Sequence, residues 1–454
     1  MADYIVAIDL GTSHLTGIVG EKHTDGTFSI VACETVDTDS CIRRGLVYNR
    51  DNTATHVGNL LRKLENRLKG GYIDKVYIGV GGQSLRTVEK IEKRDIADGA
   101  AVSEEDIAIL REQCEKYKPD LLDVLAIAPA VYYIDGRRYI DDRRGSKPVG
   151  APCKQFEARY KLVIGRSSIR HDITKSIENQ LDKKVEILVS PLTLADAMLS
   201  PEEKELGCAL VDFGAGVTSV SVFKDGSLEH ISVIPLGGKL ITRDIADLQL
   251  TEADAEKLKI EKGSAIIHKE DENELIPIDM EGADRKIKLK DLNAIIEGRV
   301  QEIVENMYAR ISEVIELRQL GAGIVLAGRA SEMNGLQELL KDKCKVNVRY
   351  STIRKELVKG ATDMLGNPLL VTAISLMLKG VEPCVSYPVI IKQQEDEKQQ
   401  EVKQEIKPED ISGIKTDRPD EKKEPEKKEE DKVKPKKKIK EAIKDIFVTK
   451  LFDE

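Results

Sequence analysis

The sequence contains no tryptophan, and aromatic residues make up only 4% of its 454 residues. Its core must therefore be built mainly from aliphatic side chains, and the length leaves room for two or three domains. None of the seven cysteines forms a C-x-x-C pair, and their number is odd. This pattern argues against a disulfide framework or a zinc site and fits reduced thiols in a cytosolic protein.

No basic leader and no long apolar run are found either. A membrane-spanning helix needs about 20 apolar residues, and no segment approaches that length, so we expect a cytoplasmic protein. The net charge is −9, and it lies almost entirely in residues 1–391, because residues 392–438 balance 15 basic against 15 acidic residues. An acidic body repels a phosphate backbone, so we expect no nucleic-acid partner.

The first 390 residues alternate strand-like and helix-like segments, which predicts an α/β fold. Strands are expected at 4–10, 15–20, 29–35, 76–80, 185–189, 207–213 and 323–326, and amphipathic helices at 51–68 and 291–319. Residues 85–165 break the alternation, with strands at 85–93, 124–134 and 156–164 and a helix whose capping box begins at Ser103. We predict that this segment is an inserted subdomain.

The end of the chain has a different character. Of the 47 residues in 392–438, 30 are charged, so this segment cannot bury enough apolar surface to fold and is predicted to be a disordered linker. On a helix, residues 436–454 would place one set of apolar side chains on a single face: Ile439, Ile443, Ile446, Phe447 and Leu451. With lysines at its entry, such a helix is suited to an anionic membrane surface. Docking on the protein's own surface is the alternative.

Two strand-to-turn segments carry the candidate chemistry. Ile8-Asp9-Leu10-Gly11-Thr12-Ser13 ends the first strand, and Val211-Asp212-Phe213-Gly214-Ala215-Gly216-Val217-Thr218 repeats its plan 203 positions later. A third glycine turn, Ala327-Gly328-Arg329, follows another strand. One such turn alone is as well explained by an ordinary hairpin. Two matched turns and a related third in one α/β chain favour a shared ligand.

These residue types suit the phosphates of a nucleotide. Glycines let backbone N–H groups approach phosphate oxygens, and the hydroxyls of Thr12 and Ser13 can donate to them. Carboxylates do not bind phosphate. Asp9 and Asp212 are instead expected to hold Mg²⁺, which keeps much of its water shell and prefers carboxylates and phosphates.

At this point the chain resembles the actin-like ATPase superfamily, in which two related lobes close over ATP. The resemblance implies a first phosphate motif of Asp9, Gly11, Thr12 and Ser13, and a second of Asp212, Gly214, Gly216 and Thr218. Gly328 falls in the adenosine motif, where Arg329 interrupts the usual run of small residues. In bacterial actins a Glu and a Lys flank the ribose and adenine, which implicates Glu256 and Lys259; a solvated helix face is the alternative.

The second phosphate motif departs from the superfamily pattern. Its central glycine is replaced by Ala215, which still allows backbone contacts to phosphate, and Val217 and Ser219 stand where Thr and Asp are usual. Losing a hydrogen bond to phosphate costs on the order of 1 kcal/mol. We therefore expect ATP binding with at most slow hydrolysis, and no residue is identified as the catalytic base.

Over nearly its whole length the chain further resembles the FtsA family of bacterial cell-division proteins. The resemblance rests on the position of the insert, the charged linker, the amphipathic end, and the segments Asn367-Pro368-Leu369 and Ile234-Pro235-Leu236-Gly237-Gly238. It implies an actin-like two-lobed fold built from ribonuclease H-like repeats. The expected divisions are 1–84 with 166–197 (first lobe), 85–165 (insert), 198–243 with 321–391 (second lobe), 244–320 (its small subdomain), 392–435 (linker) and 436–454 (membrane helix).

By the same resemblance, the function would be an ATP-binding, polymerising actin homologue that anchors the FtsZ ring to the inner face of the cell membrane at the division site. Its partners would be the FtsZ C-terminal peptide, further copies of itself, anionic lipid and downstream division proteins. Arg299 matches a position implicated in the FtsZ contact, although it is equally well explained as a solvated helix residue. A pilus-assembly ATPase and a metabolic kinase of the same superfamily are the alternatives.

Overall fold

The computed structural model describes residues 3–38, 40–97, 100–139, 147–280 and 283–387. The chain divides into two units, residues 1–389 and 390–454, and every described residue belongs to the first of them. The expected linker 392–435 and terminal helix 436–454 lie outside the described residues. Within the described part of the chain, no helix is long and apolar enough to cross a membrane.

A six-stranded sheet with the order β13-β7-β1-β2-β3-β21 forms the centre of what we call the first lobe. β1 lies inside it, antiparallel to β2 and parallel to β7. The strands are β1 (Asp3–Leu10), β2 (His14–Lys22), β3 (Phe28–Asp37), β7 (Lys75–Val80), β13 (Lys184–Val189) and β21 (Val358–Lys359). The strands expected at 4–10, 15–20, 29–35, 76–80 and 185–189 are thereby confirmed, with slightly wider bounds.

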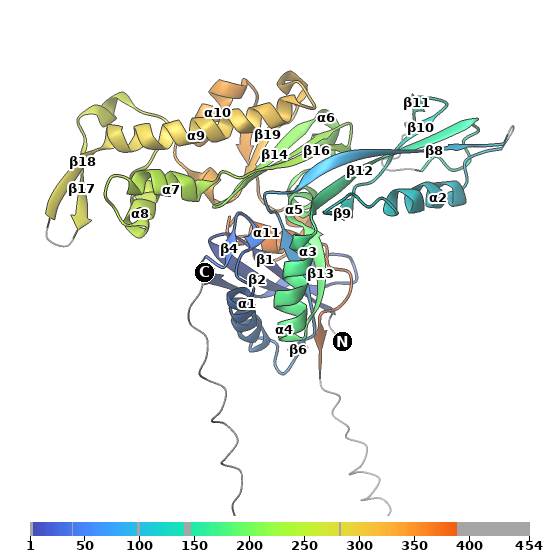
Figure 1. The fold of residues 1–454 in the computed structure, drawn as a ribbon, viewed down its shortest axis with the longest axis horizontal. Helices are drawn as coiled ribbons and strands as arrows, with labels where there is room; N and C mark the ends of the chain where they lie inside the picture. Colours follow the sequence, from blue (N-terminus) through green and yellow to red (C-terminus); the bar gives the residue numbers. More distant parts are fainter. Residues whose placement is uncertain (1–2, 39, 98–99, 140–146, 281–282, 388–454) are drawn as a thin grey trace, which may run out of the picture. The chain divides into compact units, whose positions relative to one another are not determined.

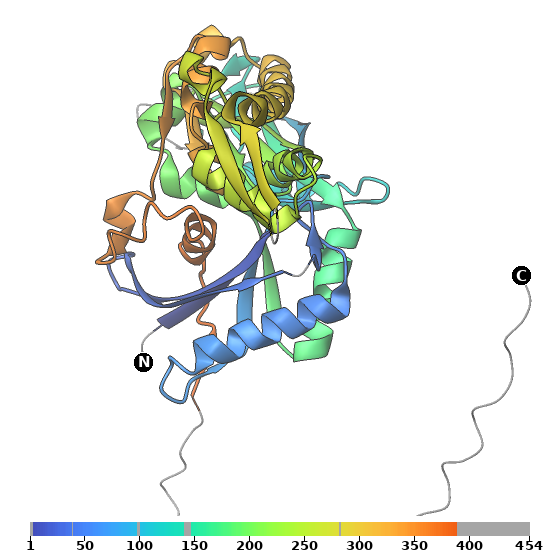
Figure 2. The ribbon, with the colours of Figure 1, turned by 90° about the vertical axis from the view of Figure 1, so that its left-hand side faces the viewer.

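Helices cover both faces of this sheet (Figure 2). α1 (Arg50–Glu65) packs on one face through Val57, Leu60 and Leu64, which recur at helical spacing and are all fully buried. Its N-cap Asn49 accepts a hydrogen bond from the backbone of Asn52 at 3.0 Å. The other face is covered by α11 (Val371–Met377) and α5 (Ser190–Met198). The remaining elements are α3 (Ser168–Ile173), η1 (Thr174–Glu178), α4 (Asn179–Leu181), β4 (Ile42–Arg43), β5 (Leu46–Val47), β6 (Tyr72–Ile73) and β22 (Val385–Ser386).

A second, ten-stranded sheet has the order β11-β10-β12-β8-β16-β15-β14-β19-β20, with β9 also paired to β12. Its strands β14, β15, β16, β19 and β20, with the helices between them, form what we call the second lobe. The strands are β14 (Cys208–Phe213), β15 (Thr218–Lys224), β16 (Ser227–Ile234), β19 (Gly323–Ala327) and β20 (Val348–Tyr350). The strands expected at 207–213 and 323–326 are therefore present.

The helices of the second lobe are α6 (Pro201–Leu206), which precedes β14, and then, between β16 and β20, α7 (Gly238–Ala246), α8 (Glu252–Lys262), α9 (Leu289–Ser312) and α10 (Leu336–Cys344). The short turns η2 (Lys269–Glu272), η3 (Leu317–Gln319) and η4 (Arg329–Glu332) lie in the same stretch, and η5 (Lys355–Leu357) follows β20. The hairpin β17 (Leu275–Met280) and β18 (Ala283–Lys288) projects at the end of the lobe away from the insert (Figure 1). The helix expected over 291–319 ends at Ser312, because the chain turns there into η3.

The remaining strands of the large sheet form the insert, residues 86–166. These are β8 (Arg86–Asp95), β9 (Leu122–Ile127), β10 (Val131–Ile134), β11 (Arg137–Arg138) and β12 (Gln155–Arg166), with α2 (Glu104–Glu115) on one face. The capping box is confirmed: Ser103 accepts from the backbone of Asp106 at 3.1 Å, and the Asp106 carboxylate accepts from the backbone of Ser103 at 2.9 Å. The single strand expected over 124–134 is wrong, because Pro129 cannot donate a ladder hydrogen bond and divides it into β9 and β10.

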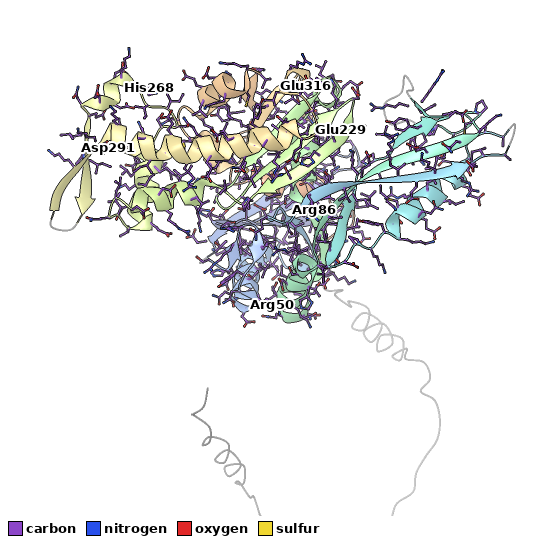
Figure 3. The ribbon with its side chains drawn as sticks, turned by 45° about the horizontal axis from the view of Figure 1, so that its top comes forward. Arg50, Arg86, Glu229, His268, Asp291 and Glu316 are labelled. Carbon is purple, nitrogen blue, oxygen red and sulfur yellow. The ribbon has the colours of Figure 1, made fainter. Side chains whose placement is uncertain are left out.

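The insert is hydrogen-bonded to the second lobe, although the chain enters and leaves it from the first. Arg86 of β8 and Ser232 of β16 form one antiparallel bridge, and Ile231 donates its backbone N–H to Thr87 Oγ1 at 3.2 Å. Beside this bridge Lys161 pairs with Glu229 at 3.4 Å; Figure 3 labels Arg86 and Glu229 where the two strands meet. Arg138 also pairs with Asp225 at 2.7 Å. We call this set of contacts the junction.

The end of the first unit returns to the first lobe. The sequence assigns residues 321–391 wholly to the second lobe, but β21 extends the first-lobe sheet and α11 packs against β1, β2 and β7. Val358, Ile374 and Met377 are buried in the first-lobe core. The chain therefore crosses between the lobes twice, once before β14 and once after β20.

Candidate nucleotide site

The first candidate turn joins β1 to β2. In this hairpin Asp9 lies opposite Thr16 and Leu10 opposite Leu15, so Gly11, Thr12 and Ser13 form a tight connection. A Cβ atom on Gly11 would lie 2.5 Å from the carbonyl oxygen of His14, which explains the glycine. The resulting turn presents the backbone of three small residues at the edge of the first lobe.

The loop after β3 holds this turn from behind. Thr38 donates its hydroxyl to the carbonyl of Thr12 at 2.9 Å, and its backbone N–H to the carbonyl of Ser13 at 3.2 Å. The Thr12 hydroxyl oxygen accepts from the backbone of Gly45 at 3.1 Å. Because the carbonyls are occupied from behind, the turn is held in one conformation before any ligand arrives.

The second candidate turn joins β14 to β15 and is held in a similar way. Gly214 donates its backbone N–H to the carbonyl of Val217 at 3.0 Å, and the carbonyls of Gly214 and Ala215 accept from Gly238 (3.0 Å) and Lys239 (2.8 Å) at the start of α7. Thr218 is fully buried and donates its hydroxyl to the carbonyl of Leu236 at 2.9 Å. Its side chain therefore supports the turn and does not face the cleft.

The two turns, 203 positions apart, lie against each other. A Cβ atom on Gly216 would lie 2.4 Å from the hydroxyl oxygen of Thr12, so this close approach requires a glycine. Lys239 of α7 also crosses between the lobes, where its ammonium group donates to the carbonyl of Thr12 at 3.2 Å. Lys239 was not predicted from the sequence, since a lysine after two glycines carries no distinctive pattern.

The carboxylates of Asp9 and Asp212, the two candidate metal ligands, are both shielded from water. Burial, together with the neighbouring Asp212, raises the pKa of Asp9 to about 7. Burial raises the pKa of Asp212 to about 6. Gly328, with φ of +82°, turns the chain beside Asp212, where a Cβ atom would lie 2.3 Å from Oδ1. Two carboxylates held this way repel each other, and a divalent cation between them would relieve that repulsion.

The described residues include no cluster of three or more His, Cys, Asp or Glu side chains arranged for a metal. Asp9 and Asp212 fit Mg²⁺ as a pair of carboxylates that would share the ion with water and phosphate oxygens. A site of this kind is filled together with its nucleotide, since the phosphates supply further oxygen ligands that the protein does not.

Glu256 and Lys259 of α8 lie on the second-lobe side of the site. Lys259 is 8% exposed and donates to Thr242 Oγ1 at 2.8 Å, to Glu256 at 2.5 Å and to the carbonyl of Gly238 at 3.2 Å. Burial lowers the pKa of Lys259 despite the nearby carboxylate. Burial alone would raise the pKa of Glu256, but hydrogen bonds from Lys259 and Thr242 bring it below its ordinary value. Lys259 and Thr242 are buried, whereas the Glu256 side chain is 43% exposed, so the cluster lies at the edge of the lobe with its carboxylate toward solvent.

Arg329 begins η4 and is exposed beside this cluster, so that its charge influences Glu256 and Lys259. Beyond Gly328 the chain lines a cavity of about 350 Å³. Its lining combines residues near both crossings with the turn at Gly328: Met198, Leu326, Ala327, Gly328, Ser331, Glu332, Tyr350, Ser351, Thr352, Gly366, Pro368 and Val371. Apart from Pro368 in Asn367-Pro368-Leu369 and Gly328, no sequence pattern marks these residues, because they come from separate loops.

Arg299 lies elsewhere, on α9 of the second lobe. Its guanidinium donates to both carboxylate oxygens of Asp244 on α7, at 2.6 and 3.1 Å, and also pairs with Glu302. Its side chain is 28% exposed. The expected membrane-facing residues of 436–454 lie outside the described residues.

Comparison with solved structures defines the class of protein. A chain of the "PilM-PilN type IV pilus biogenesis complex" superposes with a TM-score of 0.55 at 17% identity, covering 84% of this chain and 99% of that one. With the two lobes, this likeness shows the actin-like fold that the sequence predicts.

Sequence comparison identifies the family. The "Cell division protein FtsA" of Porphyromonas gingivalis is 31% identical over 84% of this chain and 79% of its own, and that of Neisseria meningitidis is 30% identical over 82% and 89%. A family profile described as "Cell division protein FtsA" matches residues 209–375. The chain therefore belongs to the FtsA family of cell-division proteins.

Proposed function

We propose that this protein is an ATP-binding, polymerising actin homologue that anchors the FtsZ ring to the inner face of the cytoplasmic membrane and recruits division proteins. The observation that carries the nucleotide part is the pair of facing turns, with Gly216 against Thr12 and the carboxylates of Asp9 and Asp212 beside them. Such a pair offers backbone N–H groups to phosphate and two carboxylates to Mg²⁺.

The roles of the other residues follow from their positions. Gly11, Thr12, Ser13, Gly214, Ala215 and Gly216 would cradle the phosphates, while Glu256, Lys259 and Arg329 would lie beside the ribose and base. The cavity beyond Gly328 offers apolar walls and a tyrosine ring next to that region, which suits a nucleobase. Val217 and Ser219 stand where the superfamily usually has Thr and Asp, so we expect the protein to bind ATP and to hydrolyse it slowly at most.

The nucleotide proposal is tested by replacing Asp9. Binding of a fluorescent ATP analogue is titrated with and without Mg²⁺ for the wild type, for Asp9→Asn, and for Asp120→Asn as a control at an exposed aspartate of the insert. We expect Asp9→Asn to lose the Mg²⁺-dependent part of the affinity and Asp120→Asn to keep it. Undiminished Mg²⁺-dependent binding by Asp9→Asn would refute the role given to this carboxylate.

The FtsZ contact is proposed to involve Arg299. An acidic peptide would compete with Asp244 and Glu302 for this guanidinium, so binding of the FtsZ C-terminal peptide should weaken in Arg299→Ala. Arg310→Ala is a matched control, because residue 310 lies 11 positions further along α9, three turns away on the same helix face. Equal peptide affinity in the two variants would remove Arg299 from the contact. A wild type that does not bind the peptide would refute the proposed FtsZ contact as a whole.

Membrane anchoring is proposed for residues 436–454, with Ile439, Ile443, Ile446, Phe447 and Leu451 on the lipid-facing side. Co-sedimentation with liposomes containing anionic lipid compares the full chain, a chain ending at residue 435 and the full chain with Phe447→Asp. We expect only the unaltered full chain to pellet strongly with the liposomes. If the shortened chain pellets equally well, the anchor lies elsewhere.

A further inference from the structure

Three side chains lie in a row at the first candidate turn, with one hydrogen bond and one ion-pair contact between them. Ser13 Oγ lies 2.9 Å from His14 Nδ1, and His14 Nε2 lies 3.2 Å from Asp37 Oδ1. His14 and Asp37 are direct cross-strand partners at the start of β2 and the end of β3. We call this set the Ser13–His14–Asp37 chain; nothing in the proposed function uses His14 or Asp37.

The contact with Asp37 favours one tautomer of neutral His14. A ring nitrogen without a hydrogen would be repelled by a carboxylate oxygen at 3.2 Å, so the tautomer that carries its hydrogen on Nε2 is favoured. His14 Nδ1 is then an acceptor, and the only hydrogen of the Ser13 hydroxyl points at it. In this state Ser13 has no hydrogen left to donate to a phosphate oxygen.

The charges around His14 come from both lobes. Burial lowers the pKa of His14, Arg329 and Lys239 act in the same direction, and Asp37 and Glu256 oppose them. The net effect lowers the pKa of His14, which favours the neutral imidazole in the protein without nucleotide. Because Arg329 and Lys239 belong to the second lobe and His14 to the first, the ring lies at the boundary where the phosphates of a nucleotide would enter.

We propose that His14 takes up a proton when the phosphates of a nucleotide bind at the first turn, and that the resulting imidazolium becomes part of the phosphate site. The inference rests on the proposed nucleotide binding and adds a residue and a proton to it.

Hydrogen-bond accounting supplies the reason. To donate to a phosphate, the Ser13 hydroxyl must turn its hydrogen away from His14, leaving two lone pairs facing each other across 2.9 Å. Protonating Nδ1 removes the conflict: Nδ1–H donates to Ser13 Oγ, Ser13 donates to phosphate, and the charged ring pairs with the Asp37 carboxylate. The phosphate charges also offset Arg329 and Lys239, the two cations that oppose protonation in the free protein.

Linkage gives the direction of the pH effect. If the pKa of His14 is higher in the complex than in the free protein, the His14 contribution to affinity grows as pH falls from the complex pKa toward the free-protein pKa. The slope cannot exceed about tenfold per pH unit for one proton. Asp9 and Asp212 also change protonation as Mg²⁺ binds, so the contribution of His14 has to be measured as a difference between variants.

Calorimetry provides that difference. Nucleotide binding is measured at pH 7.5 in buffers of different ionisation enthalpy for the wild type, for His14→Gln, and for His171→Gln as a control at an exposed histidine of α3. Glutamine keeps a hydrogen-bonding side chain but cannot become charged. We expect the wild type and His171→Gln to take up a fraction of a proton more than His14→Gln does. Equal proton uptake by all three proteins would overturn the proposal.

Nuclear magnetic resonance can follow the protonation of His14 directly in the wild-type protein. The chain has only six histidines, so selective labelling gives six imidazoles to follow, and His14→Gln assigns the relevant one. Saturating nucleotide should move the His14 nitrogens toward the imidazolium shifts at pH 7.5, and Asp37→Asn should reduce that change. An imidazole that stays neutral in the complex overturns the proposal, whereas a wild type that binds no nucleotide overturns the proposed function as well.

Discussion

At the scale of single residues, Gly216 sets the space between the two turns. A side chain there would meet the Thr12 hydroxyl oxygen at 2.4 Å and its Cβ atom at 2.8 Å. Gly216→Ala should therefore separate the turns and weaken nucleotide binding by about tenfold or more, which corresponds to roughly 1.4 kcal/mol. Equilibrium titration with a fluorescent nucleotide measures the loss.

Gly298 provides the opposite case and a control. It is an exposed residue inside α9, where a Cβ atom would have no neighbour within 4 Å. Gly298→Ala should leave nucleotide affinity unchanged and stabilise the protein by about 0.5–1 kcal/mol, because alanine loses less backbone freedom on forming a helix. Urea unfolding measures the gain. A loss of stability would contradict the open space that surrounds position 298 in the structure.

Sequence patterns predict those parts of the candidate site whose residues are neighbours in the chain. The turns around Asp9 and Asp212 could be predicted because strand, acid and glycines are neighbours in the chain. Lys239, His14 and Asp37 could not, since their role depends on cross-strand register and on contacts between lobes. Tyr350 and Glu332 line the cavity from separate loops, and no spacing rule connects them.

At the scale of elements, α2 shows what a local signal can determine. The expected capping box at Ser103 is present with both of its hydrogen bonds. Ser103→Ala should destabilise the helix by about 1 kcal/mol, because the backbone N–H of Asp106 loses its acceptor. Hydrogen exchange should become faster in α2 and remain unchanged in α1, whose cap is Asn49. Faster exchange throughout the protein would instead mean that the insert does not unfold as a local unit.

Element boundaries were less predictable than element types. Pro129 divides one expected strand into β9 and β10, and α9 stops seven residues before the expected end at Gln319. The assignment of 321–391 to the second lobe was wrong for β21 and α11, because burial of these short segments is decided by distant partners. Apolar periodicity indicates that one face of a helix is buried. It does not show whether that face packs in the core of the first lobe or in that of the second.

At the scale of the whole first unit, Asp196 of α5 joins the first crossing between the lobes to the segment that follows α11. Its carboxylate pairs with Lys204 of α6 at 2.6 Å and with Lys379, after α11, at 2.5 Å. Burial alone would raise the pKa of Asp196, but the two lysines bring it below its ordinary value. Since the carboxylate is 41% exposed, the stabilisation is on the order of 1 kcal/mol.

Asp196→Asn should lower the free energy of unfolding by that amount at pH 7 and speed nucleotide release, because the first crossing is then less firmly held. The pKa of the folded state is depressed, so the stabilisation is present above the ordinary aspartate pKa of about 3.9 and is lost as pH falls through the folded-state value. The difference in stability between wild type and variant should therefore shrink in the acid range. A difference independent of pH would assign the effect to packing and not to charge.

The junction between the insert and the second lobe has a mechanical consequence. The peptide chain fastens the insert to the first lobe, while the Arg86–Ser232 bridge and the Arg138–Asp225 pair fasten it to the second. Tension applied to the insert would therefore be shared between the two lobes. A partner that pulled on the insert would also strain the place where the two candidate turns meet, with Gly216 against Thr12.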